Sequence, residues 1–475
     1  MPRRAVVIGA GLAGLLAAAA LFPAYDEVLV LERDELPDGP EHRRGLPQGR
    51  HAHLLMPGGL EAMEFLLPQM SVRDHLLSAG AREISLSSGM VALTTEGWFH
   101  RWRKNDHHMI TCSRALLDWA VRLAVLGTAN NIHLRQGQAV ELIGDAHRIR
   151  GVRVESTSGV EDIDADFVID ASGRGSRIMK WLDRLGITGI DVRNVDSGLV
   201  NATRVYQTPP GADHFPLTMV QANPYLSLPG RSAVIVPIED HRWMVSLAGS
   251  RGGEPPADPA DFLQYTLDLP HPIVGQLISG AEPLTDVVVS RSTSNTRRYL
   301  EKARQWPERL VVLGDALATF NPAYGQGMSV AALGAQVLSR EARRTNLGAP
   351  GTARTLQRAV ARSVDAAWTL AVSQDLLYPD VRGGTPTAVD RMAARYTRRL
   401  TKAATGSYAA ASALWDVTGL KAGPARLLRP ATVLHAITGS PLPTLSEPPL
   451  TPREREILAA LDGTCGEGAP SARPV

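Results

Sequence analysis

Cysteine and lysine are scarce in this chain of 475 residues. The two cysteines, Cys112 and Cys465, lie more than 350 positions apart and do not have the spacing of a metal site. This pair predicts no disulfide framework, so we expect a reducing, cytoplasmic setting. Lysine occurs only at positions 104, 180, 302, 402 and 421, and arginine therefore supplies most of the positive charge.

Long apolar runs and an excess of one charge sign are also missing. No uninterrupted apolar stretch reaches the roughly 18 residues of a membrane span, so we expect no transmembrane segment. The basic start of the chain runs into glycines without the cleavage site of a secretory signal. With 50 basic and 48 acidic residues the formal net charge is +2, which argues against a nucleic-acid-binding function.

The pattern of apolar residues predicts an α/β protein. A strand at Ala5–Ile8, a glycine turn, an alanine-rich helix to about Phe22 and a strand at Glu27–Leu31 form a βαβ unit. Further strands are predicted at 84–104, 132–140, 149–156, 166–170, 233–237, 243–248 and 310–313. Helices are predicted at 59–67, 113–126, 328–345 and in most of the chain after 350.

This order of elements predicts two interleaved parts and a C-terminal extension. Within residues 1–345, the pieces near 1–70, 110–195 and 285–345 would build a Rossmann-type nucleotide-binding domain. The pieces near 71–109 and 195–285 would build a β-sheet substrate domain over it. Residues 346–475 would form a helical region, and we expect its proline-rich tail, from about Ser440, to wrap the surface or to be disordered.

The first motif with a chemical meaning is Gly9-Ala-Gly11-Leu12-Ala13-Gly14, between the first strand and its helix. Gly9 permits a tight turn, Gly11 lets a pyrophosphate approach the helix N-terminus, and Gly14 allows close packing of helix on strand. Glu32 ends the second strand, where a carboxylate accepts hydrogen bonds from a ribose. The alternative is a glycine turn without a ligand, and the motif alone does not separate FAD from NAD.

The second motif follows the strand at 310–313. Gly314-Asp315-Ala316 delivers an aspartate that suits a ribityl hydroxyl, and Asn321–Met328 is a glycine-containing loop that opens a helix. Backbone N–H groups of such a loop approach a flat ring, and the helix dipole stabilises negative charge on it. The alternative is a plain strand–turn–helix.

Together, the two motifs resemble the FAD-dependent monooxygenases of the aromatic-hydroxylase fold, a fold of the GR2 type, over roughly residues 1–345. The resemblance implies that the first motif binds the ADP part of FAD, and that Asp315 and the 322–328 loop bind the ribityl chain and the flavin. It also implies an arginine near the phosphates, matched by Arg114, for which a solvated helix residue is the alternative. The FAD contacts that it implies are Gly9, Gly11, Leu12, Ala13, Gly14, Glu32, Arg33, Arg44, Gln48, Arg114, Val140, Asp170, Asp315, Pro322, Gly325, Gln326, Gly327 and Met328.

The segment Arg44-Gly-Leu-Pro-Gln48-Gly-Arg50-His51-Ala-His53 resembles a loop of the epoxidases that act on polyene precursors of polyether ionophores such as monensin and lasalocid. The run from Asp170 to Arg177 is similar as well. A crossover loop that only packs against FAD is the alternative. His51 and His53 have the spacing of two metal ligands, but we find no third ligand and expect no metal site.

Two departures narrow the resemblance. Classical aromatic hydroxylases carry Asp-Gly in the middle motif, whereas Ala171 follows Asp170 here, which puts the usual binding of NADPH in doubt. Flavin halogenases carry a Trp-x-Trp-x-Ile-Pro segment. Trp98 and Trp102 are four positions apart and that segment is missing, which argues against a halogenase.

The function that the resemblance implies is epoxidation of a hydrophobic polyketide. Reduced FAD would react with O2 to a C4a-hydroperoxide, whose distal oxygen passes to a carbon–carbon double bond near Pro322. The cofactor carries this chemistry, so we expect no catalytic side chain. Electrons would come from NAD(P)H directly or through a reductase partner, and the substrate would arrive free or on a carrier. Aromatic hydroxylation of a polyketide, reduction of a prenyl chain and non-catalytic flavin binding are the alternatives.

Overall fold

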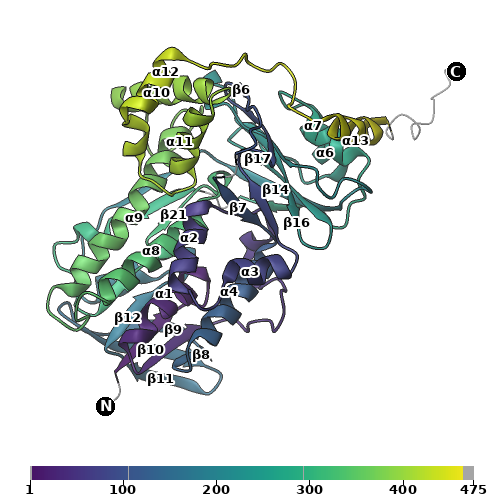
Figure 1. Cartoon of the computed structure of the whole chain (residues 1–475). Coiled ribbons are helices and arrows are strands. Elements are labelled where there is room, and N and C mark those ends of the chain that lie inside the picture. Colours follow the sequence, from purple (N-terminus) through teal and green to yellow (C-terminus); the bar gives the residue numbers. More distant parts are fainter. Residues whose placement is uncertain (1–2, 105, 292–293, 464–475) are drawn as a thin grey trace.

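A parallel five-stranded sheet forms the base of the molecule in the computed structural model, which describes residues 3–104, 106–291 and 294–463 (Figure 1). All neighbouring strands are parallel. Apart from the edge strand β8, they are almost wholly buried, which explains their continuous apolar sequence. The strand order is β20 (Leu310–Val312), β12 (Phe167–Asp170), β1 (Arg4–Ile8), β2 (Glu27–Glu32) and β8 (Ile132–Gln136).

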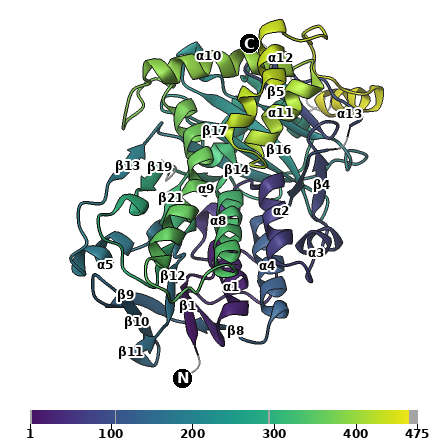
Figure 2. The same cartoon turned by 60° about the vertical axis from the view of Figure 1, so that its left-hand side comes forward.

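Helices and a small antiparallel sheet enclose this base. Helix α1 (Leu12–Leu21) is buried almost all round, and its alanines let it pack closely against β1, β2, α4 (Arg114–Thr128) and α8 (Gly327–Ala342). Figure 2 shows α1, α4 and α8 side by side. The antiparallel sheet contacts β2 and β12 and contains β9 (Gln138–Gly144), β10 (Ile149–Ser156) and β11 (Gly159–Asp164).

A second large sheet has seven strands and is mainly antiparallel. Its residues alternate between two cores: Ala233 and Ile235 face the helices α6 and α7, whereas Val236 and Ile238 face the C-terminal helices. The strand order is β18 (Val288–Ser290), β14 (Val200–Gln207), β17 (Arg242–Gly249), β16 (Arg231–Ile238), β15 (Leu217–Val220), β5 (Met90–Thr94) and β6 (Gly97–Trp98).

Shorter elements connect these layers. One three-stranded sheet has the order β13 (Val192–Val195), β19 (Asn295–Arg298) and β21 (Ala318–Thr319), and another has the order β3 (Leu54–Leu55), β7 (His108–Thr111) and β4 (Arg82–Ser85). The remaining helices before residue 300 are α2 (Pro57–Leu66), α3 (Val72–Ser78), α5 (Ile178–Arg184), α6 (Pro259–Leu267) and α7 (Ile273–Ser279).

The C-terminal region is helical, as predicted after residue 350. Helix α9 (Thr352–Asp375) covers the sheet edge at β20, where the Gln357 side chain accepts from the Val312 N–H at 2.8 Å and donates to its carbonyl at 3.1 Å. These two bonds satisfy an edge strand that would otherwise be open. Helices α10 (Ala388–Ala404), α11 (Tyr408–Thr418) and α12 (Pro430–Thr438) then cap the seven-stranded sheet (Figure 1).

Two predictions of local structure are incomplete. The insert at 195–285 contains the helices α6 and α7 besides its strands. The tail expected to wrap the surface or to be disordered is irregular up to residue 451 and then forms a helix, α13 (Pro452–Gly463), which packs on α7 through Leu461. The prolines of this segment indicated an irregular tail. Proline is also common at the first position of a helix, however, and Pro452 begins α13. Residues 464–475, including Cys465, lie outside the described residues.

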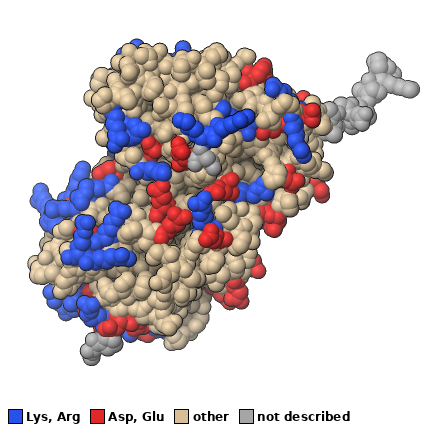
Figure 3. Space-filling view, in the orientation of Figure 1, with Lys and Arg blue, Asp and Glu red and all other residues tan. Residues whose placement is uncertain are grey.

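The charged surface mixes both signs. Four exposed arginines lie at the end of α8 and on α9, namely Arg340, Arg343, Arg358 and Arg362. Figure 3 shows basic side chains gathered over that side of the molecule, with acidic ones beside them. Within the described part of the chain, no helix combines the length and the apolar character needed to cross a bilayer.

We predict that Gly14→Ala destabilises the protein by ~1–3 kcal/mol, as overpacking does in other cores. A Cβ at Gly14 would lie 1.8 Å from the carbonyl oxygen of Gly9, so the backbone of β1 or α1 has to move. Gly11→Ala is the matched control, because a Cβ there meets no atom within 4 Å. Thermal unfolding of both variants without added ligand checks this, and an equal loss of stability in both would contradict it.

Candidate functional site

A cavity of about 680 Å³ lies at the carboxyl ends of the parallel strands. Residues that end or follow four of these strands line it, namely Ile8, Glu32, Ala171 and Asp315. This edge is where open parallel sheets bind ligands, and the volume is in the range of cofactor sites.

The glycine turn at the start of α1 forms one wall of the cavity. Gly9 has a φ of +100°, and a Cβ there would lie 2.6 Å from the carbonyl oxygen of Ala171, so this position needs glycine. Gly11 lines the cavity and has open space where a Cβ would be. No side chain caps α1 at Gly11, so the first N–H groups of the helix remain available to an anion.

A buried ion pair fixes the next part of the wall. The Arg43 guanidinium lies 2.8 Å from Glu32 Oε2 and donates to the Ala10 carbonyl at 3.0 Å. Glu32 also accepts from the Ala10 N–H at 2.9 Å. These hydrogen bonds hold the Glu32 carboxylate against the glycine turn within the protein itself.

The arginine of this segment that lines the cavity is Arg43, one residue before the predicted contact Arg44. Arg44 is exposed and does not line the cavity, whereas Arg43 is 9% exposed and does. Sequence reasoning missed Arg43 because the segment has no periodicity that tells an inward from an outward arginine. A buried partner for Glu32 was the signal that could have found it.

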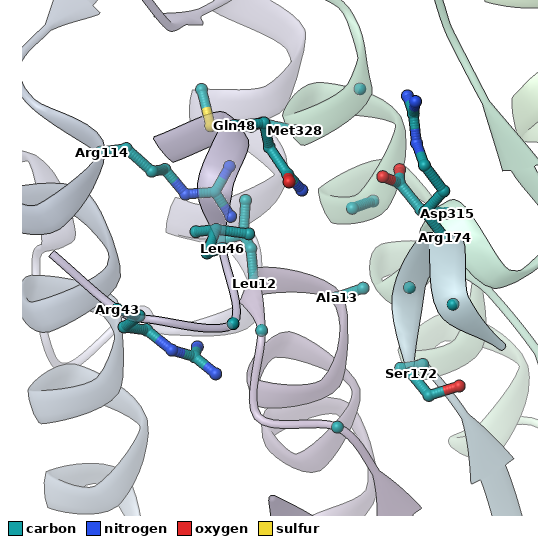
Figure 4. Close-up of a pocket in the computed structure, with 18 of the residues that line it drawn as sticks. Leu12, Ala13, Arg43, Leu46, Gln48, Arg114, Ser172, Arg174, Asp315 and Met328 are labelled. Atoms are coloured by element: carbon teal, nitrogen blue, oxygen red, sulfur yellow. The ribbon is translucent and has the colours of Figure 1, made fainter. Parts of the chain in front are cut away.

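Charge along the cavity favours an anion. Five arginines line it (Arg33, Arg43, Arg114, Arg174 and Arg177) together with three carboxylates (Glu32, Asp34 and Asp315). Figure 4 shows Arg43 and Arg114 on one side of Leu12 and Ala13, with Asp315 and Arg174 on the other. Such an excess suits a group with two negative charges, such as a pyrophosphate.

Arg114 and Asp315 hold their places for different reasons. Arg114 begins α4, whose N-cap is Ser113, and its Nε donates to Asp118 at 2.8 Å one turn on. Asp315 follows β20, and burial raises the pKa of its carboxyl, while the charges of Arg174, Arg114 and Arg298 oppose that rise. Arg298 in addition donates to the Ala316 carbonyl at 2.9 Å, which holds the turn.

Asp170 lies behind the cavity and does not line it. Its carboxylate accepts from the hydroxyls of Ser172 and Ser176, both at 2.5 Å, and from the Ser172 N–H at 3.0 Å. Burial raises the pKa of Asp170, and these hydrogen bonds oppose that. The segment that it shapes, Ala171–Gly175, is the part that lines the cavity.

The loop before α8 is held by a buried carboxylate from the C-terminal helix α9. Asp375, 1% exposed, accepts from Asn295 Nδ2 at 2.6 Å, Asn321 Nδ2 at 3.0 Å and Tyr324 Oη at 2.6 Å. Burial and the charge of Asp375 raise the pKa of Tyr324 well above its usual value, so its hydroxyl stays a donor. Sequence reasoning missed Asp375, because it ends an ordinary long helix far from the motifs.

Both histidines of the 44–53 segment line the cavity. His51 Nδ1 lies 2.9 Å from Thr203 Oγ1, and His53 Nδ1 donates to the His51 carbonyl at 2.7 Å. Burial lowers the pKa of His51 to about 4 and that of His53 to about 3, with the charge of Arg114 adding to the second shift. Both rings are therefore neutral at neutral pH. Among the described residues no group of three His, Cys, Asp or Glu side chains has the arrangement of a metal site.

Three polar atoms of the lining residues have no hydrogen-bond partner among the residues that the structure describes: Arg43 Nε, His51 Nε2 and Gln326 Oε1. Buried polar atoms are rarely left without a hydrogen bond. Gly11 and Gly327 also line the cavity, and a Cβ at either position would have no atom within 4 Å. The lining therefore fits a long ligand that offers both hydrogen-bonding groups and negative charge, as FAD does.

Comparison with known proteins agrees with this geometry. Residues 3–341 match the protein family described as FAD binding domain. The chain belongs to this family of FAD-binding monooxygenases. It is an enzyme of the aromatic-hydroxylase type with FAD as cofactor, and such monooxygenases use O2 with electrons from NAD(P)H or a reductase. The predictions of fold class, FAD and enzyme class are confirmed.

Individual relatives extend the comparison. Protein Rv3254 of Mycobacterium tuberculosis is 30% identical over 388 residues, 79% of this chain and 80% of that protein. Kynurenine 3-monooxygenase of Salinispora tropica is 27% identical over 341 residues, 69% of this chain and 70% of its own. The structure of the flavin-dependent brominase Bmp2 superimposes with a TM-score of 0.62 at 13% identity, covering 91% of this chain and 98% of its own, which shows a shared fold.

In this monooxygenase most of the residues expected at the FAD site lie around the one cavity. Gly14, Arg44, Val140 and Asp170 do not line it. Gly14 packs against Gly9, and the Val140 carbonyl accepts from Trp181 Nε1 at 2.8 Å. Those that line it are Gly9, Gly11, Leu12, Ala13, Glu32, Arg33, Gln48, Arg114, Asp315, Pro322, Gly325, Gln326, Gly327 and Met328.

We predict that Arg43→Met lowers the free energy of unfolding by about 3–5 kcal/mol, because it leaves the buried Glu32 carboxylate without its partner. Arg44→Met is the matched control and should change stability by less than about 0.5 kcal/mol, as substitutions at exposed positions usually do. Denaturant unfolding of both variants measures the difference. Equal effects, or a larger effect at Arg44, would contradict the pairing of Arg43 with Glu32.

Proposed function

We propose that this monooxygenase transfers one oxygen atom of O2 to a carbon–carbon double bond of a hydrophobic polyketide, a polyene, and so forms an epoxide. The other oxygen atom is released as water, with the two electrons supplied by NAD(P)H or a reductase. The observation that carries the proposal is the apolar wall beside the 322–328 loop, where Leu54, Phe320 and Pro322 line the cavity. A double bond needs no side chain to remove a proton before it accepts an electrophilic oxygen, so a dry apolar wall suits it. The likeness of segment 44–53 to polyene epoxidases supports the same substrate class.

In this proposal the residues that line the cavity would hold FAD. Gly11, at the N-terminus of α1, and Arg114 would bind its pyrophosphate, and Glu32 would bind the ribose of the ADP part. Asp315 would hold the ribityl chain. Residues 322–328 would hold the flavin ring, and the N-terminus of α8 would stabilise negative charge on the reduced ring.

The protein's contribution is binding, orientation and exclusion of water. Reduced FAD supplies the activation of O2. Leu54, Phe320 and Pro322 keep water from the reacting carbon, and the seven-stranded sheet, through Asn201 of β14 and Ser290 of β18, closes the cavity on the substrate side. Substrate enters free or on a carrier, and electrons arrive from NAD(P)H or a reductase.

Asp315→Ala should purify without the yellow colour of flavin, because the carboxylate that receives the ribityl chain is gone. Asp315→Asn, which keeps a hydrogen-bonding side chain of the same shape, should retain part of the FAD. Absorbance spectra and extracted FAD per protein chain measure both. An alanine variant with stoichiometric FAD would sink the role given to Asp315.

Aromatic hydroxylation of a polyketide is the second candidate, and His51 favours it. The Ala52 N–H donates to Ser246 Oγ at 3.1 Å, Ser246 Oγ lies 2.5 Å from Thr203 Oγ1, and Thr203 lies 2.9 Å from His51 Nδ1. If Ser246 donates to Thr203 and Thr203 to His51, every hydroxyl proton has an acceptor. Nε2 then carries the proton of the neutral ring and offers it to an oxygen, such as that of a phenol, bound in the cavity.

A pair of variants separates the two candidates. His51→Gln keeps a donor near the position of Nε2, whereas His51→Asn keeps only an atom near Nδ1. If His51 binds a substrate phenol, wild-type enzyme and the glutamine variant should bind 4-hydroxystyrene about tenfold more tightly than styrene, the worth of one buried hydrogen bond, and the asparagine variant should not. Perturbation of the flavin absorbance measures the affinities. The product decides the reaction: an epoxide at the vinyl group supports the first candidate, and a catechol supports the second.

A further inference from the structure

The outer surface of the C-terminal cap carries large apolar side chains in water. Leu434 and Ile437 of α12 are 58% and 74% exposed, and Leu428 before that helix is 68% exposed. Val389 and Met392 of α10 are 68% and 66% exposed. Single exposed apolar residues are ordinary, but four on two neighbouring helices and a fifth just before one of them form a patch that calls for a partner.

These residues lie on neighbouring elements of the C-terminal cap. Helices α10 and α12 pack side by side, as Figures 1 and 2 both show. In α12 Ala436 is buried in the core, whereas Leu434 and Ile437 lie on other faces of the helix and are exposed. In α10 Val389 and Met392 share a face with the buried Leu400 and Ala403, but they lie at the start of the helix and are exposed there. We call this surface, made of Val389, Met392, Leu428, Leu434, Ile437 and the exposed basic residues between them, the cap surface.

Positive charge surrounds the apolar residues of the cap surface. At helical spacing, Met392, Arg395, Arg399 and Lys402 lie on one face of α10, and all four are exposed. Arg429, the N-cap of α12, is exposed as well. Between positions 391 and 446 the sequence has eight basic residues and a single acid, Asp416. Three of the eight are paired: Arg426 with Asp416, Arg398 with Glu96 and Lys421 with Glu61. The other five, Arg391, Arg395, Arg399, Lys402 and Arg429, are exposed.

We propose that the cap surface binds the surface of an anionic lipid membrane, with the leucines and isoleucine in the interface and the arginines on the headgroups. Amphipathic helices that combine apolar and basic faces lie in the plane of a membrane without crossing it. Each arginine or lysine near an anionic leaflet adds about 1 kcal/mol of attraction. The proposed partner is the surface of the membrane, because no helix among the described residues is long and apolar enough to cross a bilayer.

Charge distinguishes this partner from a second copy of the chain. A two-fold dimer brings the same patch of both copies together, so the basic residues of the cap surface would face one another. Like charges placed together at an interface cost free energy, whereas an anionic lipid surface pairs with them. A membrane also offers depth for the apolar side chains of two adjacent helices.

The test is sedimentation of the full-length holoenzyme with lipid vesicles. We expect binding to vesicles of phosphatidylcholine mixed with phosphatidylglycerol, weak binding to phosphatidylcholine alone, and loss of binding as salt is raised. The double variants Leu434→Ser/Ile437→Ser and Arg395→Gln/Arg399→Gln should each weaken partitioning about tenfold. Thermal unfolding and FAD content should match the wild type in both, because these side chains are exposed.

Matched controls lie elsewhere on the chain. Val160→Ser removes a 63% exposed apolar side chain of β11, and Arg358→Gln/Arg362→Gln removes two exposed arginines of α9; neither should alter vesicle binding. Equal binding by the cap and control variants, or no binding of the wild type to anionic vesicles, would overturn the proposal. A wild-type dimer in solution that Leu434→Ser/Ile437→Ser converts to monomer would assign the cap surface to a second copy instead.

Discussion

The hydrogen bonds to Asp375 are the interaction on which one end of the cavity depends, the end where we propose that the flavin binds. A carboxylate that is 1% exposed requires donors, because an unpaired buried charge costs several kcal/mol. Its donors include Asn295 in β19 and two residues of the loop before α8, Asn321 at its start and Tyr324 within it. Satisfying one side chain therefore fixes the position of a loop that has no strand or long helix of its own.

This dependence makes the C-terminal helix α9 part of the site. Near its start, Gln357 pairs with the backbone of β20, the strand that delivers Asp315. At its end, Asp375 holds the loop that follows. Both segments of the second motif are thus set by a single rigid helix outside residues 3–341, the part of the chain that matches the FAD-binding family. Residues far from the motifs can in this way decide how the flavin ring is held.

The sequence predicted the parallel sheet well for a physical reason. Its central strands are buried on both faces, so they appear as continuous apolar runs, and the glycines at 9 and 14 are required by atoms of the backbone itself. Irregular segments lack such a signal. In the 40–58 loop nothing local distinguishes Arg43 from Arg44, because the partner that buries Arg43, Glu32, becomes its neighbour only in the folded chain. Asp375 was missed for the same reason, because its hydrogen-bond donors Tyr324 and Asn295 lie 51 and 80 positions away in the sequence.

Shared fold does not decide which reaction the cavity supports. The brominase Bmp2 has the same fold at 13% identity, and folds of this kind host several chemistries. In the proposed binding mode the glycine turn and the 322–328 loop bind the cofactor and do not select the substrate. What can discriminate is the opposite wall, where Asn201 and Ser290 of the seven-stranded sheet and His51 of the crossover loop lie among apolar residues. If His51 Nε2 carries a proton, as the hydroxyls of Thr203 and Ser246 favour, a substrate that brings an oxygen to that wall is bound better than a pure hydrocarbon. The choice between an alkene and a phenol therefore lies in a few polar atoms of this wall.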